Sequence, residues 1–335
     1  MDILVVGTLM LGVTLLGIIL FANFLHVRDR RIEKLVFDIF LFLISALVLF
    51  IGAMLIVIPP DFFEQANGAA AGSFDMRSYG IVLAITGAVA MALSIGKVRR
   101  LLARIMPINP GSPVHSLALF LSIYLIGYTL LLLSQGGLSG LAESAEPAPL
   151  FSLILQGFLF ALVAMFGVGF VIRRRGRELA HRLGLERPTL KQLAVAVGLI
   201  LILVLLQACA GLIWGYLNPD QSKIMEDIGE VLFTEIDTVW EWLILALATG
   251  ISEEVLFRGA LQPALGLGFT SVLFALIHIQ YGFSPVTLFI VLLAIVLGLV
   301  RRYYSTTITI FIHVGYNFTL GMLAVLAAYL QDVVA

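Results

Sequence analysis

The chain has 335 residues, of which 61% are hydrophobic and 12% charged, whereas a soluble domain carries about 25% charged residues. Its 20 Lys and Arg and 21 Asp and Glu nearly cancel, so no basic surplus favours nucleic acid as a partner. This composition excludes a single water-soluble domain. It predicts an all-α polytopic transmembrane helical bundle, with membrane lipid as a partner.

Apolar runs recur along the whole chain at the length of a membrane span, which is roughly 20 residues. We predict ten spans, at about 3–25, 35–58, 79–96, 115–134, 150–172, 191–214, 238–256, 267–281, 285–300 and 306–330. The eighth, at 267–281, is shorter than the roughly 20 residues of a full span. Because Met1-Asp2-Ile3-Leu4 lacks the positive segment of a signal peptide, we expect the first run to be a retained span.

The loops between these spans alternate in basic charge. Every odd-numbered loop contains Arg or Lys, whereas the even-numbered loops are poor in both. The positive-inside rule therefore places the odd loops in the cytoplasm and both termini outside. Trp240 and Trp242 fit an aromatic belt at the outer end of the seventh span.

The longest basic segment, 173–191, predicts a boundary between two parts of the chain. We expect an N-terminal transmembrane module at 1–185 and a C-terminal domain at 190–335, each with about five spans. The arginines between them are typical of orientation and attraction to anionic lipid. In the second span, Asp38 is expected to reach back to Lys34, four residues earlier.

Only the C-terminal half carries ionisable side chains well inside its spans. These are Glu253, Glu254, His278 and His313, with the amide of Asn317 one turn beyond. At a rise of 1.5 Å per residue, all fall in a layer about 8–16 Å from the cytoplasmic face. Charges at such depth are costly and usually mark a functional site.

Helical spacing assigns the two adjacent acids different roles. Glu254 and Arg258 are four residues apart, so they can pair and keep the carboxylate ionised. Glu253 points about 100° away on the helix. A drier setting there would suit Glu253 to act as a general base.

The remaining polar residues suggest the rest of a hydrolytic site. His313 and Asn317 are also four residues apart and can present two donors on one face, as an oxyanion hole requires. His278, from a separate helix, could share the proton of a water held by Glu253. Each signal alone has a structural explanation, such as a solvated acidic face or an interhelical hydrogen bond. Their convergence at one depth favours function.

The three motifs Glu253-Glu254-x-x-x-Arg258, Phe274-x-x-x-His278 and His313-x-x-x-Asn317 resemble those of the CPBP family. This family contains the CAAX-prenyl-endopeptidase and bacteriocin-processing type of intramembrane proteases, also called type II CAAX proteases or the ABI family. The resemblance covers about 190–335. The first 185 residues lie outside it.

The resemblance implies an endopeptidase whose helices surround a cavity open to the cytoplasm. By similarity, Glu253 and His278 would activate the attacking water, and His313 and Asn317 would stabilise the oxyanion. Glu254 and Arg258 would support the site. Zinc is a candidate cofactor, with Glu253, His278 and His313 as candidate ligands. The sequence has no HExxH motif, so we favour a metal-free reaction.

The sequence therefore predicts an intramembrane endopeptidase of the cytoplasmic membrane, acting on a peptide or membrane-protein substrate. One alternative is a non-enzymatic bacteriocin-immunity or scaffold protein that retains the same polar cluster. A second is a proton-coupled transporter using the Glu/His pair as a relay. The nearly apolar outer halves of the spans count against the transporter.

Overall fold

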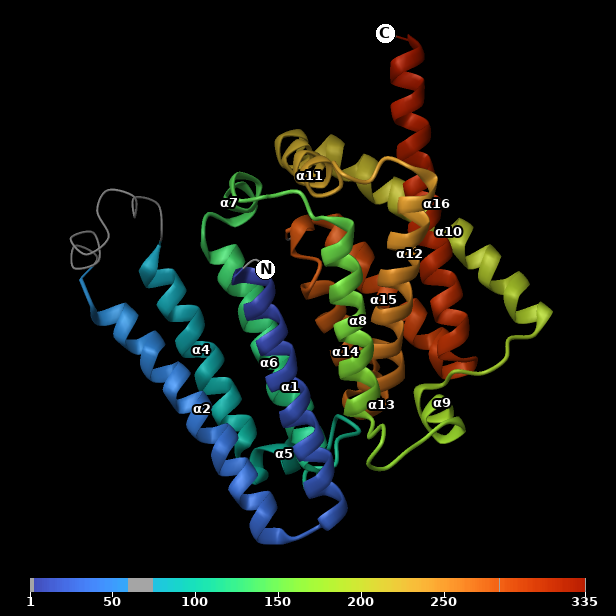
Figure 1. Ribbon diagram of the computed structural model, residues 1–335. Helices are drawn as coiled ribbons and strands as arrows, with labels where there is room; N and C mark the ends of the chain where they lie inside the picture. The colour runs from blue at the N-terminus through green and yellow to red at the C-terminus, as the bar shows by residue number, and fades with distance from the viewer. Residues whose placement is uncertain (1–2, 60–74, 283, 335) are drawn as a thin grey trace.

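The computed structural model describes residues 3–59, 75–282 and 284–334, and all its regular elements there are helical (Figure 1). The N-terminal helices are α1 (Ile3–Arg28), α2 (Arg31–Val57), α4 (Met76–Ser94), α5 (Gly96–Leu102), α6 (Pro113–Ser134), α7 (Gly137–Glu143), α8 (Leu150–Gly167) and α9 (Arg177–Leu183). The C-terminal helices are α10 (Leu190–Leu217), α11 (Pro219–Leu232), α12 (Val239–Glu254), η2 (Val255–Leu261), α13 (Gln262–Leu265), α14 (Leu267–Leu276), η3 (Ile279–Tyr281), α15 (Pro285–Tyr303) and α16 (Thr306–Val334). The prediction of an all-α bundle is confirmed.

Eight of the described helices are long and apolar enough to cross a membrane: α1, α2, α4, α6, α8, α10, α15 and α16. They correspond to eight of the ten predicted spans. The predicted seventh span, 238–256, falls on α12 and the start of η2, and α12, η2 and α13 follow one another without a gap from 239 to 265. The predicted eighth span is only the ten-residue helix α14. At 1.5 Å per residue α14 covers about 15 Å, half of a ~30 Å hydrocarbon core.

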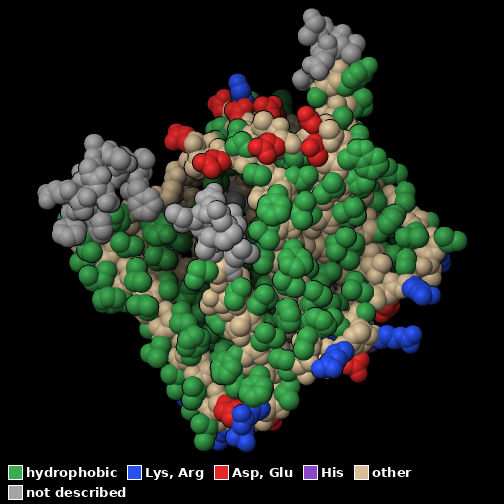
Figure 2. All heavy atoms as spheres, viewed as in Figure 1, with side chains coloured by type: hydrophobic (Ala, Val, Ile, Leu, Met, Phe, Trp, Pro, Cys, Tyr) green, Lys and Arg blue, Asp and Glu red, His purple; other side chains and the backbone are tan. Residues whose placement is uncertain are grey.

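Charge separates the two ends of the bundle. Figure 2 shows acidic side chains gathered at one end and blue Lys and Arg side chains at the other. In Figure 1, α11 with its acidic residues lies at the first end, together with the start of α1 and the end of α16. This arrangement agrees with the predicted topology, in which both termini lie on the side opposite the arginine-rich loops.

Three hydrophobic clusters form the core of the described residues: two larger ones, and a small one that joins Ile108, Leu119, Ala264 and Leu265. The first joins residues of α1, α2, α4 and α6, including Phe37 and Leu41. The second surrounds η2, α14, α15 and α16, and it also contains Ala164 of α8. Helix α8 packs directly against α12 and η2. The predicted domain boundary at 185–190 stays a prediction. Helix α8 precedes this boundary in the sequence but contributes to the C-terminal core.

The expected pairing of Asp38 with Lys34 is wrong. Asp38 instead forms an ion pair with the buried Arg99, with 2.5 Å between Oδ2 and Nη2. Lys34 pairs with Asp29. Because Asp38 lies in α2 and Arg99 in α5, the partner is distant in the sequence, and local spacing did not reveal it.

Candidate active site

The site begins where an ordinary helix changes its pitch. Helix α12 starts with a capping box in which Thr238 and Glu241 satisfy each other's backbone donors. After Glu254 the chain continues as the π-helical η2 for seven residues. π-Helical segments are rare in proteins, and those that occur are often found at functional sites. The adjacent acids therefore lie at the junction of two helical geometries.

A proline helps to explain the altered pitch. Pro263 lies four residues after Gly259, and it has no N–H to donate to the Gly259 carbonyl. The Arg182 guanidinium donates to that carbonyl instead, with 2.8 Å from Nη1 to O. Arg182 belongs to α9, whose end is also bound to the start of α16, because Thr306 Oγ1 donates to the Leu183 carbonyl at 2.6 Å. Thus α9 ties together η2 and α16.

We expect Arg182→Gln to weaken this connection. A hydrogen bond from a charged donor contributes about 1.5–3 kcal/mol, so the free energy of unfolding should fall by about that amount. Denaturant titration of the purified protein measures the change. The exposed Arg177 of the same helix gives the matched control Arg177→Gln, which should change little. Equal effects of the two substitutions would contradict a specific role for Arg182.

Glu254 and Arg258 form the predicted pair, and both are completely buried. The distance from Arg258 Nε to Glu254 Oε2 is 3.3 Å, and both side chains are 0% exposed. The other carboxylate oxygen of Glu254 contacts His313, with 3.0 Å between Oε1 and Nδ1. The Glu254 carboxylate therefore joins η2 to α16. The contact with His313 was not predicted.

The aromatic ring of Phe274 joins this buried group to α14. Its ring centroid lies 5.0 Å from the Arg258 guanidinium carbon and 5.9 Å from the ring centroid of His313. It also lies 4.8 Å from the ring centroid of His278. A cation over an aromatic face is stabilised by the ring quadrupole. Phe274 thus positions three of the predicted site residues, a role that its spacing before His278 did not reveal.

His278 lies just after the end of α14 and is half-buried. Its Nδ1 is 2.9 Å from the Phe274 carbonyl oxygen. A carbonyl can only accept, so Nδ1 carries the proton and Nε2 of the neutral ring keeps a lone pair. His278 is therefore oriented to accept a proton through Nε2.

The two remaining predicted residues are also half-buried. Asn317 Nδ2 donates to Thr249 Oγ1 of α12 at 3.1 Å, which leaves its second amide hydrogen available. Glu253 has one buried carboxylate oxygen, Oε2, that has no hydrogen-bond partner within the described part of the chain. The site therefore has two parts. Glu254, Arg258 and His313 form a buried ionic group, and the less buried side chains of Glu253, His278 and Asn317 lie on or next to the helices around it.

The predicted metal ligands do not form a metal site in this arrangement. Among residues 3–59, 75–282 and 284–334, no three His, Cys, Asp or Glu side chains are grouped so that they could hold a metal ion. The donor set thus does not fit zinc, and no reaction step below depends on a metal.

Helices α12 and α16 approach closely at Gly250, one turn before Glu254. A Cβ atom at Gly250 would lie 3.0 Å from the Val314 backbone nitrogen and 2.7 Å from its Cγ2. Val314 adjoins His313. The absence of a side chain at Gly250 therefore allows the contact between Glu254 and His313.

We expect Gly250→Ala to separate these helices and to lower both stability and activity. The added methyl group meets backbone, so relief requires a shift of α16, and overpacking of this kind costs typically 1–3 kcal/mol. Thermal unfolding and the cleavage rate measure the two effects. Gly198→Ala in α10 is the control, because a Cβ there has no heavy atom within 4 Å. Normal activity of Gly250→Ala would show that the close approach is dispensable.

The fold and the candidate site together indicate the class of protein. The chain is a multi-pass membrane protein that encloses a cluster of ionisable side chains among its helices, as intramembrane enzymes do. Residues 235–319 match the family model described as type II CAAX prenyl endopeptidase Rce1-like, a family of peptide-bond hydrolases. The match confirms the predicted resemblance. It covers about a quarter of the chain, which is shorter than the predicted stretch of 190–335. All six predicted site residues lie inside it. Neither the curated proteins nor the solved structures include a significant match to the chain.

Proposed function

We propose that the protein is an endopeptidase of the cytoplasmic membrane that hydrolyses a peptide bond with a water activated by Glu253 and His278. The observation that carries the proposal is the contact of Glu254 with His313 and Arg258, within the segment that matches the CAAX-type family. A completely buried ionic group at this position costs free energy to maintain. Such a group is expected where it orients residues that react.

In the first step, Glu253 holds the water and His278 Nε2 accepts its proton. The resulting hydroxide attacks the carbonyl carbon of the scissile bond, and the carbonyl oxygen becomes an oxyanion. The oxyanion then collapses to a carboxyl group as the C–N bond breaks, and His278 gives the proton to the leaving amine, so the ring is neutral again after each cycle. Its Nδ1–H bond to the Phe274 carbonyl keeps the tautomer and ring orientation throughout.

The oxyanion is stabilised from α16. Asn317 supplies its second amide hydrogen, because the first is donated to Thr249. His313 acts as an imidazolium that donates Nδ1–H to Glu254 and Nε2–H to the oxyanion. One oxyanion-hole donor contributes about 2.7–4 kcal/mol to stabilisation of the transition state. Arg258 balances the charge of Glu254 and does not touch the substrate.

A metal-free reaction predicts that chelators leave activity unchanged. We expect the purified protein to cleave its substrate at the same rate before and after treatment with excess EDTA or phenanthroline. Elemental analysis of the same sample should give less than stoichiometric zinc. Loss of activity that only added zinc restores would contradict the metal-free reaction while leaving the endopeptidase assignment intact.

Substrate trapping tests the function itself. The Glu253→Gln variant should bind substrate without cleaving it, so crosslinking in membranes followed by mass spectrometry identifies the trapped proteins. The wild-type protein, reconstituted in lipid vesicles, should then cleave a trapped protein at one site. Failure of the wild type to cleave any trapped protein would contradict the proposal.

A further inference from the structure

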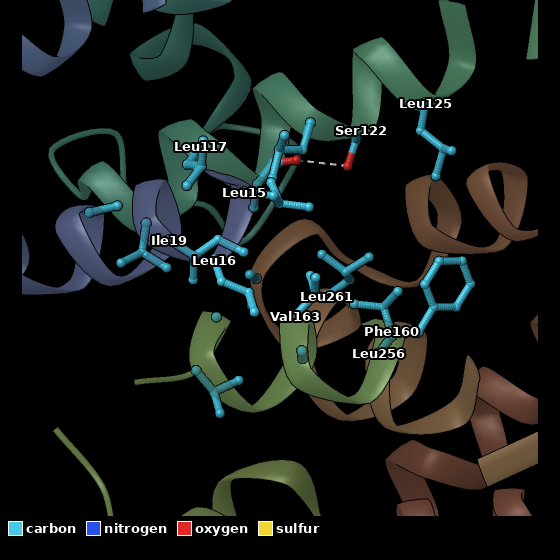
Figure 3. A pocket seen from close by; sticks show the side chains of 18 of the residues that line it. Leu15, Leu16, Ile19, Leu117, Ser122, Leu125, Phe160, Val163, Leu256 and Leu261 are labelled. Carbon is cyan, nitrogen blue, oxygen red and sulfur yellow. Dashed lines mark hydrogen bonds between the residues drawn. The ribbon is translucent and has the colours of Figure 1, made fainter. Parts of the chain in front are cut away.

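A large cavity lies apart from the candidate active site. Its volume is about 460 Å³, and it is lined mainly by α1, α6, α8 and η2. This volume is within the size range of small-molecule sites. Figure 3 shows Leu15 and Leu16 of α1, Leu117 of α6, Val163 of α8 and Leu256 of η2 directed toward this space. None of the six proposed site residues lines it.

The cavity has the length and character of an acyl-chain site. Its lining extends along α1 from Leu11 to Asn23, which is about 18 Å at the helical rise. One leaflet of a ~30 Å hydrocarbon core is about 15 Å deep. Between those two residues every α1 side chain on the lining is aliphatic or absent. A single lipid chain running parallel to the helices fits these dimensions.

Four polar residues occur together at the cytoplasmic end of the cavity, whereas Ser122, Tyr124 and Tyr128 line it further along α6. The four are Asn23 near the end of α1, His115 at the start of α6, and Arg173 and Arg182 from the segment after α8. Asn23 is 0% exposed. Its Nδ2 donates to the Ile19 carbonyl at 3.0 Å and to the Phe166 carbonyl at 2.9 Å.

The second polar atom of Asn23 lacks a partner. Its Oδ1 is buried and accepts no hydrogen bond from any described residue. Buried acceptors are nearly always satisfied. Asn23 is one of the residues that line the cavity, so a ligand that brings a hydroxyl donor to this end would satisfy its Oδ1. The head group of phosphatidylglycerol carries such a hydroxyl.

The arginines at this end donate to backbone carbonyls but have no carboxylate partner among the described residues. Over the described ranges, neither Arg173 nor Arg182 has a carboxylate within the 4.0 Å of an ion pair. Burial and then the neighbouring Arg174, Arg173 and Arg301 lower the pKa of Arg182 to about 10. Burial and then Arg174 also lower the pKa of Arg173. Cations that repel one another beside an apolar cavity favour an anionic head group.

We propose that this cavity binds an anionic glycerophospholipid of the cytoplasmic leaflet, with one acyl chain along α1 and α6 and its phosphate at Arg173 and Arg182. The lipid chain would lie between the N-terminal helices and the segment that matches the protease family. It contacts Leu256 and Leu261 of η2, next to Glu254 and Arg258. A structural role for the N-terminal helices follows, because they complete a lipid site against the π-helical segment.

Lipid binding to the full-length purified protein tests this proposal without measuring cleavage. Native mass spectrometry of delipidated protein, titrated with phosphatidylglycerol, should give one tightly bound lipid. Phosphatidylcholine with the same acyl chains should bind at least tenfold more weakly. Arg173→Gln should weaken phosphatidylglycerol binding about fivefold to tenfold. The exposed Arg175 of the same loop does not line the cavity, so Arg175→Gln is the matched control and should bind normally.

Substitutions that fill the cavity with a larger side chain provide a second test of the proposal. Leu16→Trp should abolish the tight binding, and the milder Leu16→Phe should weaken it even where the larger substitution disturbs folding. Equal binding of the two head groups would overturn the proposal, as would equal effects of Arg173→Gln and Arg175→Gln. Normal binding to a correctly folded Leu16→Phe or Leu16→Trp protein would place the chain elsewhere. Displacement of phosphatidylglycerol by a lipidated peptide at equal concentration would identify a substrate site instead.

Discussion

Glu253→Gln and His278→Ala are each expected to abolish peptide cleavage while the protein still inserts and folds. Each removes a group that handles the proton of the attacking water, and general acid–base catalysis contributes roughly 10²- to 10⁴-fold in rate. The measurement is the single-turnover cleavage rate of a trapped substrate in lipid vesicles. Binding should be retained, because neither side chain belongs to the buried Glu254, Arg258 and His313 group.

Matched substitutions separate chemistry from general damage. Glu235→Gln changes an exposed acid just before α12, and His181→Ala changes an exposed histidine of α9. Both should cleave at the wild-type rate. Full activity of either Glu253→Gln or His278→Ala would contradict the roles assigned to these residues.

The second large effect concerns the buried ion pair. Arg258→Met leaves the Glu254 carboxylate buried beside His313 without its guanidinium partner. Breaking a buried pair from one side costs about 3–5 kcal/mol. The double substitution Glu254→Gln with Arg258→Met removes both charges, so it should recover most of that loss. Denaturant titration in detergent measures the free energy of unfolding of the three proteins.

Activity should not recover with stability. In the double variant the Glu254 carboxylate no longer holds His313 Nδ1 at 3.0 Å, so the oxyanion donor is misplaced. We therefore expect a stable but inactive protein. A double variant as unstable as Arg258→Met would show that packing, and not charge, sets the cost. A double variant with normal cleavage would show that the ionic group does not position the site.

The non-enzymatic alternative gives a different result in cells. A scaffold or immunity protein needs the fold and its surfaces, so it should tolerate Glu253→Gln. An enzyme should lose its cellular phenotype with the same substitution. The phenotype of cells carrying Glu253→Gln, compared with Glu235→Gln at equal membrane abundance, distinguishes the two.

The sequence predicted features that depend on local spacing or on composition. Eight of the ten spans were recovered because length and apolarity alone mark them. The Glu254–Arg258 pair was recovered because residues four apart share one helix face, and the pair survives the change to π-helical pitch. The match of 235–319 to the CAAX-type family was foreseen from three short motifs.

The sequence did not predict contacts set by the tilt and rotation of distant helices. The contact between Glu254 and His313 requires the close approach of α12 and α16 at Gly250. Asp38 was assigned to Lys34, whereas its partner Arg99 lies 61 residues away. The cavity between α1, α6, α8 and η2 likewise depends on packing across the whole chain, and no periodicity in the sequence encodes it.

The most direct test of the central claim is the origin of new carboxyl termini in membranes suspended in heavy-oxygen water. Membranes with the wild-type protein should yield peptides whose new terminal carboxylate contains heavy oxygen from the attacking water. Membranes with an equal amount of Glu253→Gln should lack those termini. The same set of labelled termini in both membranes would contradict the account.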